Sequence, residues 1–322
     1  MAVSTRQALL QALSAAGGSY VSGQQLAETL GVSRAAVHKA AAALTAQGYA
    51  LEAAPRRGYR LAGGDPFCAE AIGDYPAPIY LYDTLESSNR TAKLLALDGA
   101  PHGTLVLTAH QSAGRGRLGR RFESPAGKGV YCSVLLRPKM PAANAQTATI
   151  SAAVAVCRAV KKLCGLELAV KWVNDLYYQG RKVCGILTEA ALDLESGMLD
   201  YAVLGLGFNV VAPAEGWPAE LQSVAGALFD GDPAPGARAA LAAAFLNEFW
   251  PLYRTGPRSG YLDEYRSRLA LAGHRVLVTP RSGTPRPAAV LGIDDECRLV
   301  VRYDGESRPA ALTSGEAGVR LL

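Results

Sequence analysis

Arginine and glycine alternate in one short stretch of the sequence, residues 111–121. The glycines are Gly114, Gly116 and Gly119, and the arginines are Arg115, Arg117, Arg120 and Arg121. Glycine lets backbone N–H groups approach a ligand closely, and each guanidinium matches two carboxylate or phosphate oxygens at once. We therefore expect this loop to bind an anion, most simply a nucleotide phosphate.

The arginine-glycine loop belongs to neither of the two best-known phosphate motifs. No Gly-Lys-Ser/Thr follows it, as a Walker A loop requires, and no acidic residue follows at the spacing of a dinucleotide fingerprint. The same composition also suits a solvated linker or a nonspecific nucleic-acid arm. Apolar runs on either side, residues 104–109 and 129–136, predict two buried strands that would hold the loop between them.

A second stretch, residues 170–187, combines strand-like apolar residues with charge. Lys171, Asp175 and Lys182 border segments that we expect to be buried, where a charge is costly unless it is paired or holds a ligand. Asn174 and Asp175 can ligate Mg²⁺ or bind a ribose. Lys182 can neutralise a carboxylate and an α-phosphate together.

Three small polar residues, Ser87, Ser88 and Asn89, follow a predicted strand at 79–83 and precede a helical pattern at 91–97. They can cap the helix or present hydroxyl and amide groups at its N-terminus. Taken alone, a plain cap is the simpler interpretation. A further strand at 199–206 leads into Gly207 and Asn209.

The first 64 residues are basic. They hold six arginines and lysines against two glutamates, so this fifth of the chain carries +4 of the total charge of +5. A basic N-terminal segment followed by a nearly neutral remainder is typical of a nucleic-acid-binding module joined to a domain of another function.

Helices predicted at 4–16, 23–30 and 33–47, with Ser22 and Ser33 as N-caps, give a helix-turn-helix pattern. A hairpin at 49–61 follows and resembles a wing. The expected DNA contacts, with base edges or phosphates, are Ser33, Arg34, His38 and Lys39 on the third helix and Arg56 and Arg57 at the wing tip. The alternative is a small helical domain used for protein contacts.

The rest of the chain predicts an α+β protein of three domains: residues 1–64, 65–272 and 273–322. Residues 144–164 should form a core helix, 212–236 an exposed excursion, and 237–254 and 258–271 two further helices. Short alternating runs at 275–278, 288–293, 299–303 and 318–321 predict a small barrel-like β domain.

Composition excludes several other classes. No apolar run approaches the roughly 20 residues of a membrane span, and the N-terminus lacks the apolar core of a signal peptide. The six cysteines form no Cys-x-x-Cys pair and the four histidines are scattered, so we expect no structural metal and a cytoplasmic protein.

Four motifs together resemble the biotin protein ligases, in that family's order and over essentially the whole chain. They are the arginine-glycine loop at 114–120, Lys-Trp-Val-Asn-Asp at 171–175, Lys-Val-Cys-Gly-Ile-Leu at 182–187 and Gly-Leu-Gly-Phe-Asn at 205–209. The winged helix in front is similar to that of the bifunctional members, the biotin operon repressors. The resemblance implies a central mixed sheet with helices and a C-terminal SH3-like β-barrel.

The resemblance also implies a reaction. Biotin and ATP with Mg²⁺ would give biotinyl-5′-adenylate, and a lysine of the biotin carboxyl carrier protein would then accept the biotin. The adenylate-bound homodimer would bind operator DNA. Lys182 and Arg117 are the expected catalytic residues. Those expected to bind biotin or its adenylate are Ser87, Ser88, Asn89, Gln111, Gly114, Arg115, Gly116, Arg117, Arg120, Phe122, Tyr131, Lys182 and Gly185, with Asn174, Asp175 and Asn209 near the nucleotide or metal.

The sequence departs from the family at Ser88, Leu118, Phe122 and Val173, where threonine, a basic residue, tryptophan and proline are common. None of these changes removes a group that the reaction needs. Two other functions fit the same residues: a regulator that senses biotin without transferring it, and a lipoate ligase with a similar catalytic fold.

Overall fold

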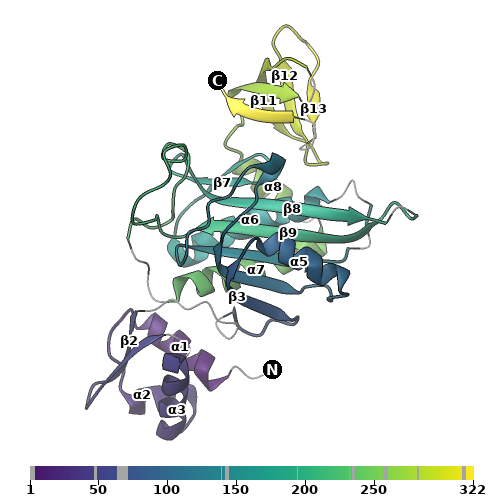
Figure 1. The fold of residues 1–322 in the computed structure, drawn as a ribbon. Coiled ribbons are helices and arrows are strands. Elements are labelled where there is room, and N and C mark those ends of the chain that lie inside the picture. The colour runs from purple at the N-terminus through teal and green to yellow at the C-terminus, as the bar shows by residue number, and fades with distance from the viewer. Residues whose placement is uncertain are drawn as a thin grey trace. The chain divides into compact units, whose positions relative to one another are not determined.

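A computed structural model of the chain describes residues 4–46, 49–63, 72–138, 140–141, 145–193, 195–231, 233, 236–256, 260–280, 283–313 and 317–322. The chain forms two compact units. Figure 1 shows its helices and strands. Unit 1 comprises residues 1–137, 205–217 and 227–244, and unit 2 comprises residues 138–204, 218–226 and 245–322. Residues 64–71, which include the predicted boundary between the first two domains and Cys68, lie outside the described residues.

The N-terminal module begins with three helices, α1 (Thr5–Ala15), α2 (Gly23–Leu30) and α3 (Arg34–Ala46). The predicted caps are confirmed, because Ser22 Oγ accepts a hydrogen bond from Gln25 N and Ser33 Oγ accepts one from Ala36 N, both at 3.1 Å. These bonds satisfy helix N–H groups that have no partner within the helix.

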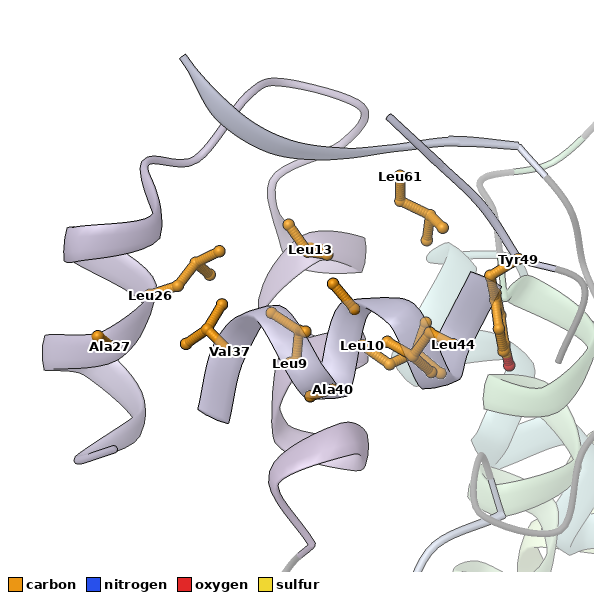
Figure 2. Packing of buried hydrophobic residues seen from close by; sticks show 11 residues of the cluster. Leu9, Leu10, Leu13, Leu26, Ala27, Val37, Ala40, Leu44, Tyr49 and Leu61 are labelled. Atoms are coloured by element: carbon orange, nitrogen blue, oxygen red, sulfur yellow. The ribbon is translucent and has the colours of Figure 1, made fainter. Parts of the chain in front are cut away.

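A two-stranded antiparallel hairpin, β1 (Ala50–Ala54) and β2 (Gly58–Gly63), completes the module as the predicted wing. Leucines of the three helices, Val37, Tyr49 and Leu61 of β2 form its core (Figure 2). Burying each of these large side chains stabilises the module by about 1.5–3 kcal/mol. The module therefore has a core of its own.

A seven-stranded sheet runs in the order β3-β4-β5-β9-β8-β7-β6. Its strands are β3 (Ile79–Leu85), β4 (Leu105–Gln111), β5 (Gly129–Leu136), β6 (Ala169–Lys171), β7 (Asp175–Tyr178), β8 (Arg181–Leu192) and β9 (Leu199–Asn209). The sheet is mixed, since β3 and β4 are parallel whereas β4 and β5 are antiparallel. Every residue of β5 is buried, which explains why the sequence there is apolar apart from Ser133.

Helices flank this sheet within each unit. In unit 1, α5 (Ser88–Leu97) packs on β4 and β5. In unit 2, the predicted Ala-rich helix is α6 (Gln146–Cys164), which packs on β8 and on α8 (Tyr261–Ser267). The remaining long helix is α7 (Ala237–Thr255).

The C-terminal residues form a five-stranded antiparallel sheet in the order β13-β12-β11-β10-β14. Its strands are β10 (Arg275–Pro280), β11 (Arg286–Ile293), β12 (Leu299–Tyr303), β13 (Ala310–Leu312) and β14 (Ala317–Leu321). Four of these were predicted. The sequence did not reveal β13, because three residues, Ala-Ala-Leu, are too short to show an alternation.

Some predicted boundaries were wrong. Helix α5 begins at Ser88 rather than Thr91, and β9 continues to Asn209 instead of ending at residue 206. Helix α8 is shorter than predicted. The excursion after residue 211 is not wholly exposed, since Ala225 and Leu228 are buried. Among the described residues, no helix has the length and apolar character needed to cross a bilayer.

Gly58 and Gly31 provide a test of how the wing is attached. Both glycines have positive φ, 95° and 64°. A Cβ on Gly58 would lie 2.1 Å from Val21 O, whereas a Cβ on Gly31 would meet nothing within 4 Å. We expect Gly31→Ala to destabilise the module by about 1 kcal/mol through backbone strain alone, and Gly58→Ala by at least about 3 kcal/mol. Amide hydrogen exchange of α2 and β2 measures the loss of stability in each variant. Equal losses of stability in the two variants would show that Gly58 is not in close contact with Val21.

Candidate active site and nucleic-acid interface

Five polar side chains form a hydrogen-bonded network inside unit 1. Gln111 Oε1 accepts from Ser88 N at 2.9 Å and from Ser88 Oγ at 3.1 Å, and Gln111 Nε2 donates to Ser124 Oγ at 2.8 Å. Ser133 Oγ lies 2.9 Å from Ser88 Oγ and 2.6 Å from Asn89 Oδ1. All five side chains are buried.

This network corrects the simple interpretation of residues 87–89 as a cap. Ser87 occupies the N-cap position, yet its side chain makes no capping hydrogen bond, and Ser88 and Asn89 lie inside the first turn. Their side chains join α5 to the end of β4 and to β5. Ser124 and Ser133 were not predicted as site residues. Ser133 in the otherwise apolar strand β5 was a usable signal, because a buried hydroxyl is costly unless it is hydrogen-bonded.

Main-chain hydrogen bonds hold the arginine-glycine loop in place. Ser112 N donates to Leu85 O and Ala113 N to Glu86 O, both at 2.9 Å, which fixes the start of the loop. Phe122 N then donates to Gly114 O at 2.9 Å, and Gly116 N to Arg120 O at 2.7 Å. A Cβ on Gly114 would lie 2.4 Å from Phe122 O, so this closure requires glycine.

The arginine side chains of the loop extend into water. Arg115, Arg120 and Arg121 are exposed and Arg117 is half-buried. Arg115 lies 3.8 Å from Glu86 and Arg121 lies 3.3 Å from Glu123. Ion pairs this exposed contribute little stability. An incoming anion can therefore displace them at small cost.

Strand β9 brings two glycines against the same group of side chains. A Cβ on Gly205 would lie 2.1 Å from Asn89 Oδ1, and one on Gly207 would lie 2.4 Å from the Phe122 ring. Asn209, two residues further on the same face of the strand, is buried. Unit 1 thus gathers Asn89 and Phe122, which the resemblance implies for the biotin or adenylate, and Asn209, which it implies near the nucleotide or metal.

Tyr131 is buried in β5 and its hydroxyl donates to Pro125 O at 3.2 Å. Burial raises the pKa of the Tyr131 phenol far above its usual range, an effect that the nearby Arg238 guanidinium reduces. The phenol is therefore neutral at physiological pH. It can line a pocket or donate a hydrogen bond, but it does not supply a negative charge.

Unit 2 contains a partly buried ion pair between neighbouring strands. Lys182 Nζ of β8 lies 2.7 Å from Asp175 Oδ1 of β7, and each side chain is 25% exposed. Gly185 is the register partner of Asp175. Burial, together with the Asp175 charge, raises the pKa of Tyr177 to about 12. The structure therefore brings together Asp175, Lys182 and Gly185, three of the residues that the family resemblance implies for the site.

The turn before Asp175 is fixed to β8. Asn174 Nδ2 donates to Ile186 O at 2.8 Å, and Ile186 N donates to Asn174 O at 2.9 Å. Trp172 and Val173 are buried, and the peptide bond between them is cis. In the part of the chain that the structure describes, no three histidine, cysteine or carboxylate side chains come together as metal ligands.

The winged-helix module presents its basic residues outward. Arg34, His38 and Lys39 are exposed along α3, and Ser33 caps that helix. Arg56, with φ of 64°, and Arg57 are exposed at the wing tip. The first turns of α3 and the wing thus both offer positive charge to a nucleic acid.

Tyr20, which sequence analysis missed, organises the wing arginines. The Arg57 guanidinium lies 4.0 Å from the Tyr20 ring centroid, a cation–π contact. The Tyr20 hydroxyl and Arg60 Nε both donate to Glu52 at 2.8 Å. The hydrogen bond from Tyr20, followed by that from Arg60, lowers the pKa of the Glu52 carboxyl.

Known proteins resemble this chain in sequence. The sequence matches the Biotin/lipoate A/B protein ligase family over residues 81–209 and a helix-turn-helix domain over residues 5–60. It is 33% identical over 309 residues to the bifunctional ligase/repressor BirA of Bacillus spizizenii, covering 92% of this chain and 93% of that protein. The chain belongs to the biotin protein ligases.

A second relative and a solved structure agree with this family assignment. The bifunctional ligase/repressor BirA of Bacillus subtilis is 36% identical over 233 residues, covering 69% of this chain and 70% of that protein. A structure of a biotin protein ligase mutant from Aquifex aeolicus in complex with biotin superimposes with a TM-score of 0.63 at 22% identity, over 76% of this chain and 99% of that chain. The ligase therefore has the same fold as that enzyme, and its four motifs lie within the matched residues 81–209.

The buried network predicts a difference between two serines of the ligase. Ser133 is fully buried and contacts Ser88 and Asn89, whereas Ser112 is exposed. We expect Ser133→Ala to lower the free energy of unfolding by about 1–3 kcal/mol, because it leaves buried polar atoms with fewer partners. The matched change Ser112→Ala should stay within about 0.5 kcal/mol of the parent. Chemical denaturation of the two variants measures this; similar small losses would mean that the network contributes little.

Proposed function

We propose that this chain activates biotin with ATP to biotinyl-5′-adenylate, transfers biotin to a lysine of the biotin carboxyl carrier protein, and represses transcription as an adenylate-bound dimer. One observation carries the proposal. The chain aligns with a bifunctional ligase/repressor across 92% of its own length and 93% of the relative's, so both functional modules occur in one chain.

The buried network of unit 1 suits the neutral ring system of biotin. A cyclic urea has both donors and acceptors, and the hydroxyl and amide groups of Ser88, Asn89 and Gln111 are held by one another before any ligand arrives. Such preorganisation reduces the entropy lost on binding. Ser87 and Tyr131 of unit 1 are also proposed to contact biotin, as is Gly185 of unit 2.

The first step joins two anions, so fixed positive charge is required. A biotin carboxylate oxygen attacks the α-phosphorus of ATP, the bond from that phosphorus to the bridging oxygen breaks, and pyrophosphate leaves. Lys182 and Arg117 would stabilise the charge that develops on the α-phosphate oxygens. Backbone and side-chain donors of Gly114, Arg115, Gly116 and Arg120 would hold the adenylate.

The second step moves biotin to the carrier protein. A neutral lysine amine of the carrier attacks the acyl carbon of the adenylate, the bond from that carbon to the phosphate oxygen breaks, and AMP leaves. Lys182 would again stabilise the departing phosphate. Phe122 offers a flat apolar face to the adenine, against the backbone of Gly207.

The nucleotide side of the site contains oxygen donors suited to Mg²⁺. Asp175 supplies a carboxylate, and Asn174 and Asn209 supply amide oxygens, which are ligands that this hard cation prefers. In unit 2, Asn174 and Asp175 would hold Mg²⁺ together with the ATP phosphates, where the ion would neutralise phosphate charge, and Asn209 of unit 1 is proposed to lie near the nucleotide. Asp175 also orients Lys182 through their ion pair.

Lipoate ligation is the alternative from the same family, whose description covers biotin and lipoate ligases alike. Incubation of a carrier domain with this chain, ATP and either acid, followed by mass measurement, separates the two. Addition of biotin alone supports the proposal, and addition of lipoate in its place would replace it. No addition of either acid would favour a biotin-sensing regulator.

Lys182→Ala tests the proposed catalytic role. We expect it to lower biotin-dependent pyrophosphate release by at least about 10²-fold, because the α-phosphate loses its fixed cation. Lys162→Ala is the matched control, since that side chain is 70% exposed on α6 and pairs at 3.8 Å with Glu248. Normal pyrophosphate release from Lys182→Ala would rule out the role assigned to this lysine.

Arg56→Ala combined with Arg57→Ala tests the wing. We expect weaker binding to DNA upstream of biotin-synthesis genes, with the slope of log K against log salt reduced by about 2, because two phosphate contacts are lost. Biotin transfer should be unchanged. Arg320→Ala, which removes an exposed arginine from β14, is the control. An unchanged affinity for DNA at several salt concentrations would count against DNA contacts by these two wing arginines.

Repression is tested by a gel shift of the same DNA with three preparations: protein alone, protein with biotin, and protein with biotin, ATP and magnesium. Adenylate should favour dimers, which place one winged helix on each half of a two-fold operator. We expect the shift to appear or strengthen only in the third preparation. No shift in any of them, with carrier still biotinylated in parallel, would leave a ligase without the repressor function.

A further inference from the structure

A loop of the C-terminal sheet contacts the Lys-Trp-Val-Asn-Asp motif within unit 2. This loop, Ile293–Arg298, joins β11 to β12 and is called the 293–298 loop below. The carbonyl oxygen of Cys297 accepts two hydrogen bonds, from Trp172 Nε1 at 3.1 Å and from Gln146 Nε2 at 2.8 Å. Cys297 is 2% exposed and has a φ of 62°, so its backbone is turned for this contact.

The 293–298 loop is held in shape by its own side chains. Asp294 Oδ1 accepts from Arg298 N at 2.8 Å and from Glu296 N at 3.2 Å. Arg298 Nε donates to Asp294 Oδ2 at 2.7 Å, and Cys297 N donates to Asp294 O at 3.1 Å. The Cys297 carbonyl is thus fixed from within the loop.

Helix α8 fastens the same loop to the catalytic body. Arg266 donates from Nη2 to Asp295 at 2.6 Å and from Nε to Ile293 O at 3.3 Å. Arg266 is itself held by Asp263, one helical turn earlier, at 2.8 Å. Two groups of α6 and α8, Gln146 and Arg266, therefore contact the loop in addition to Trp172.

The motif that receives these contacts is fixed residue by residue. Trp172 bonds to the 293–298 loop, and Val173 O accepts from the Tyr265 hydroxyl of α8 at 3.1 Å. Asn174 is bonded to Ile186 of β8. The next residue is Asp175, the partner of Lys182.

We propose that the 293–298 loop is a positioning element for Lys182. By holding Trp172, the loop sets the path of residues 172–174 and hence the place of the Asp175 carboxylate that orients the Lys182 ammonium group. The importance of this for ligation rests on the proposed function. A reacting group displaced by about 1 Å can lose up to about 10²-fold in rate. The C-terminal sheet thereby contributes to the chemistry through Trp172 and Asp175.

Two variants release the contact in different ways. Trp172→Phe keeps a buried aromatic ring, although a smaller one, and removes the N–H donor, whereas Arg266→Met frees the loop from α8 and leaves Trp172 intact. The matched control is Asp304→Asn, which breaks the exposed pair of Asp304 with Arg275 elsewhere in the C-terminal sheet. All three are made in the full chain.

Hydrogen exchange of the segment 182–187 is the first measurement, because Ile186 N donates to Asn174 O and reports whether the turn is held. We expect exchange at least tenfold faster in Trp172→Phe and Arg266→Met than in the parent, and unchanged in Asp304→Asn. Parent-like exchange in both variants, or equal acceleration in the control, would overturn the proposal.

Kinetics supply a second measurement that a merely structural role would not affect in the same way. For both variants we expect kcat of pyrophosphate release to fall about tenfold while KM for biotin stays within about twofold, since the network that would bind biotin lies in unit 1. A parent-like kcat would overturn the positioning role. A parent chain that releases no pyrophosphate would refute the proposed function, and hydrogen exchange would still decide whether the loop holds the turn.

Discussion

Hydroxyl and amide groups placed in an apolar interior must bond to one another, and the candidate site depends on this requirement. Ser133 lies in a strand whose every residue is buried, so its hydroxyl needs partners on α5. Ser88 in turn needs Gln111, at the end of β4, and Gln111 needs Ser124. The network therefore fixes how helix, strand and loop meet, and the arginine-glycine loop begins where it is most firmly held.

The site has two electrostatic environments. The side chains around Gln111 are neutral and buried, where an uncompensated charge would be costly. The arginines of the loop are at least partly exposed, and water lowers the cost of keeping them charged before substrate arrives. A neutral ring suits the buried, neutral environment, and a polyphosphate suits the exposed, positively charged one. One ligand that carries both groups can therefore contact both environments.

The sequence predicted what local patterns determine. Both N-caps, the wing and strand β5 follow from a few neighbouring residues each, and the structure confirms them. Contacts between distant residues were not predictable: Ser133 and Asn89 are 44 residues apart, and Trp172 and Cys297 are 125 apart. Tyr20 was missed because a lone tyrosine gives no sign of an arginine stacked on it. The roles of the site residues came from family motifs and stay predictions.

Gly205 and Gly207 leave two positions on one face of β9 without a side chain, and Asn89 and the Phe122 ring fill that space. At each of these two positions, the absence of a side chain lets Asn89 or Phe122 pack directly against the strand. Attempts to change the accepted acid or nucleotide by directed evolution should therefore leave positions 205 and 207 untouched and vary the residues opposite them. A smaller side chain in place of Phe122 would open space beside Gly207, whereas a side chain at position 205 or 207 would collide with Asn89 or the Phe122 ring.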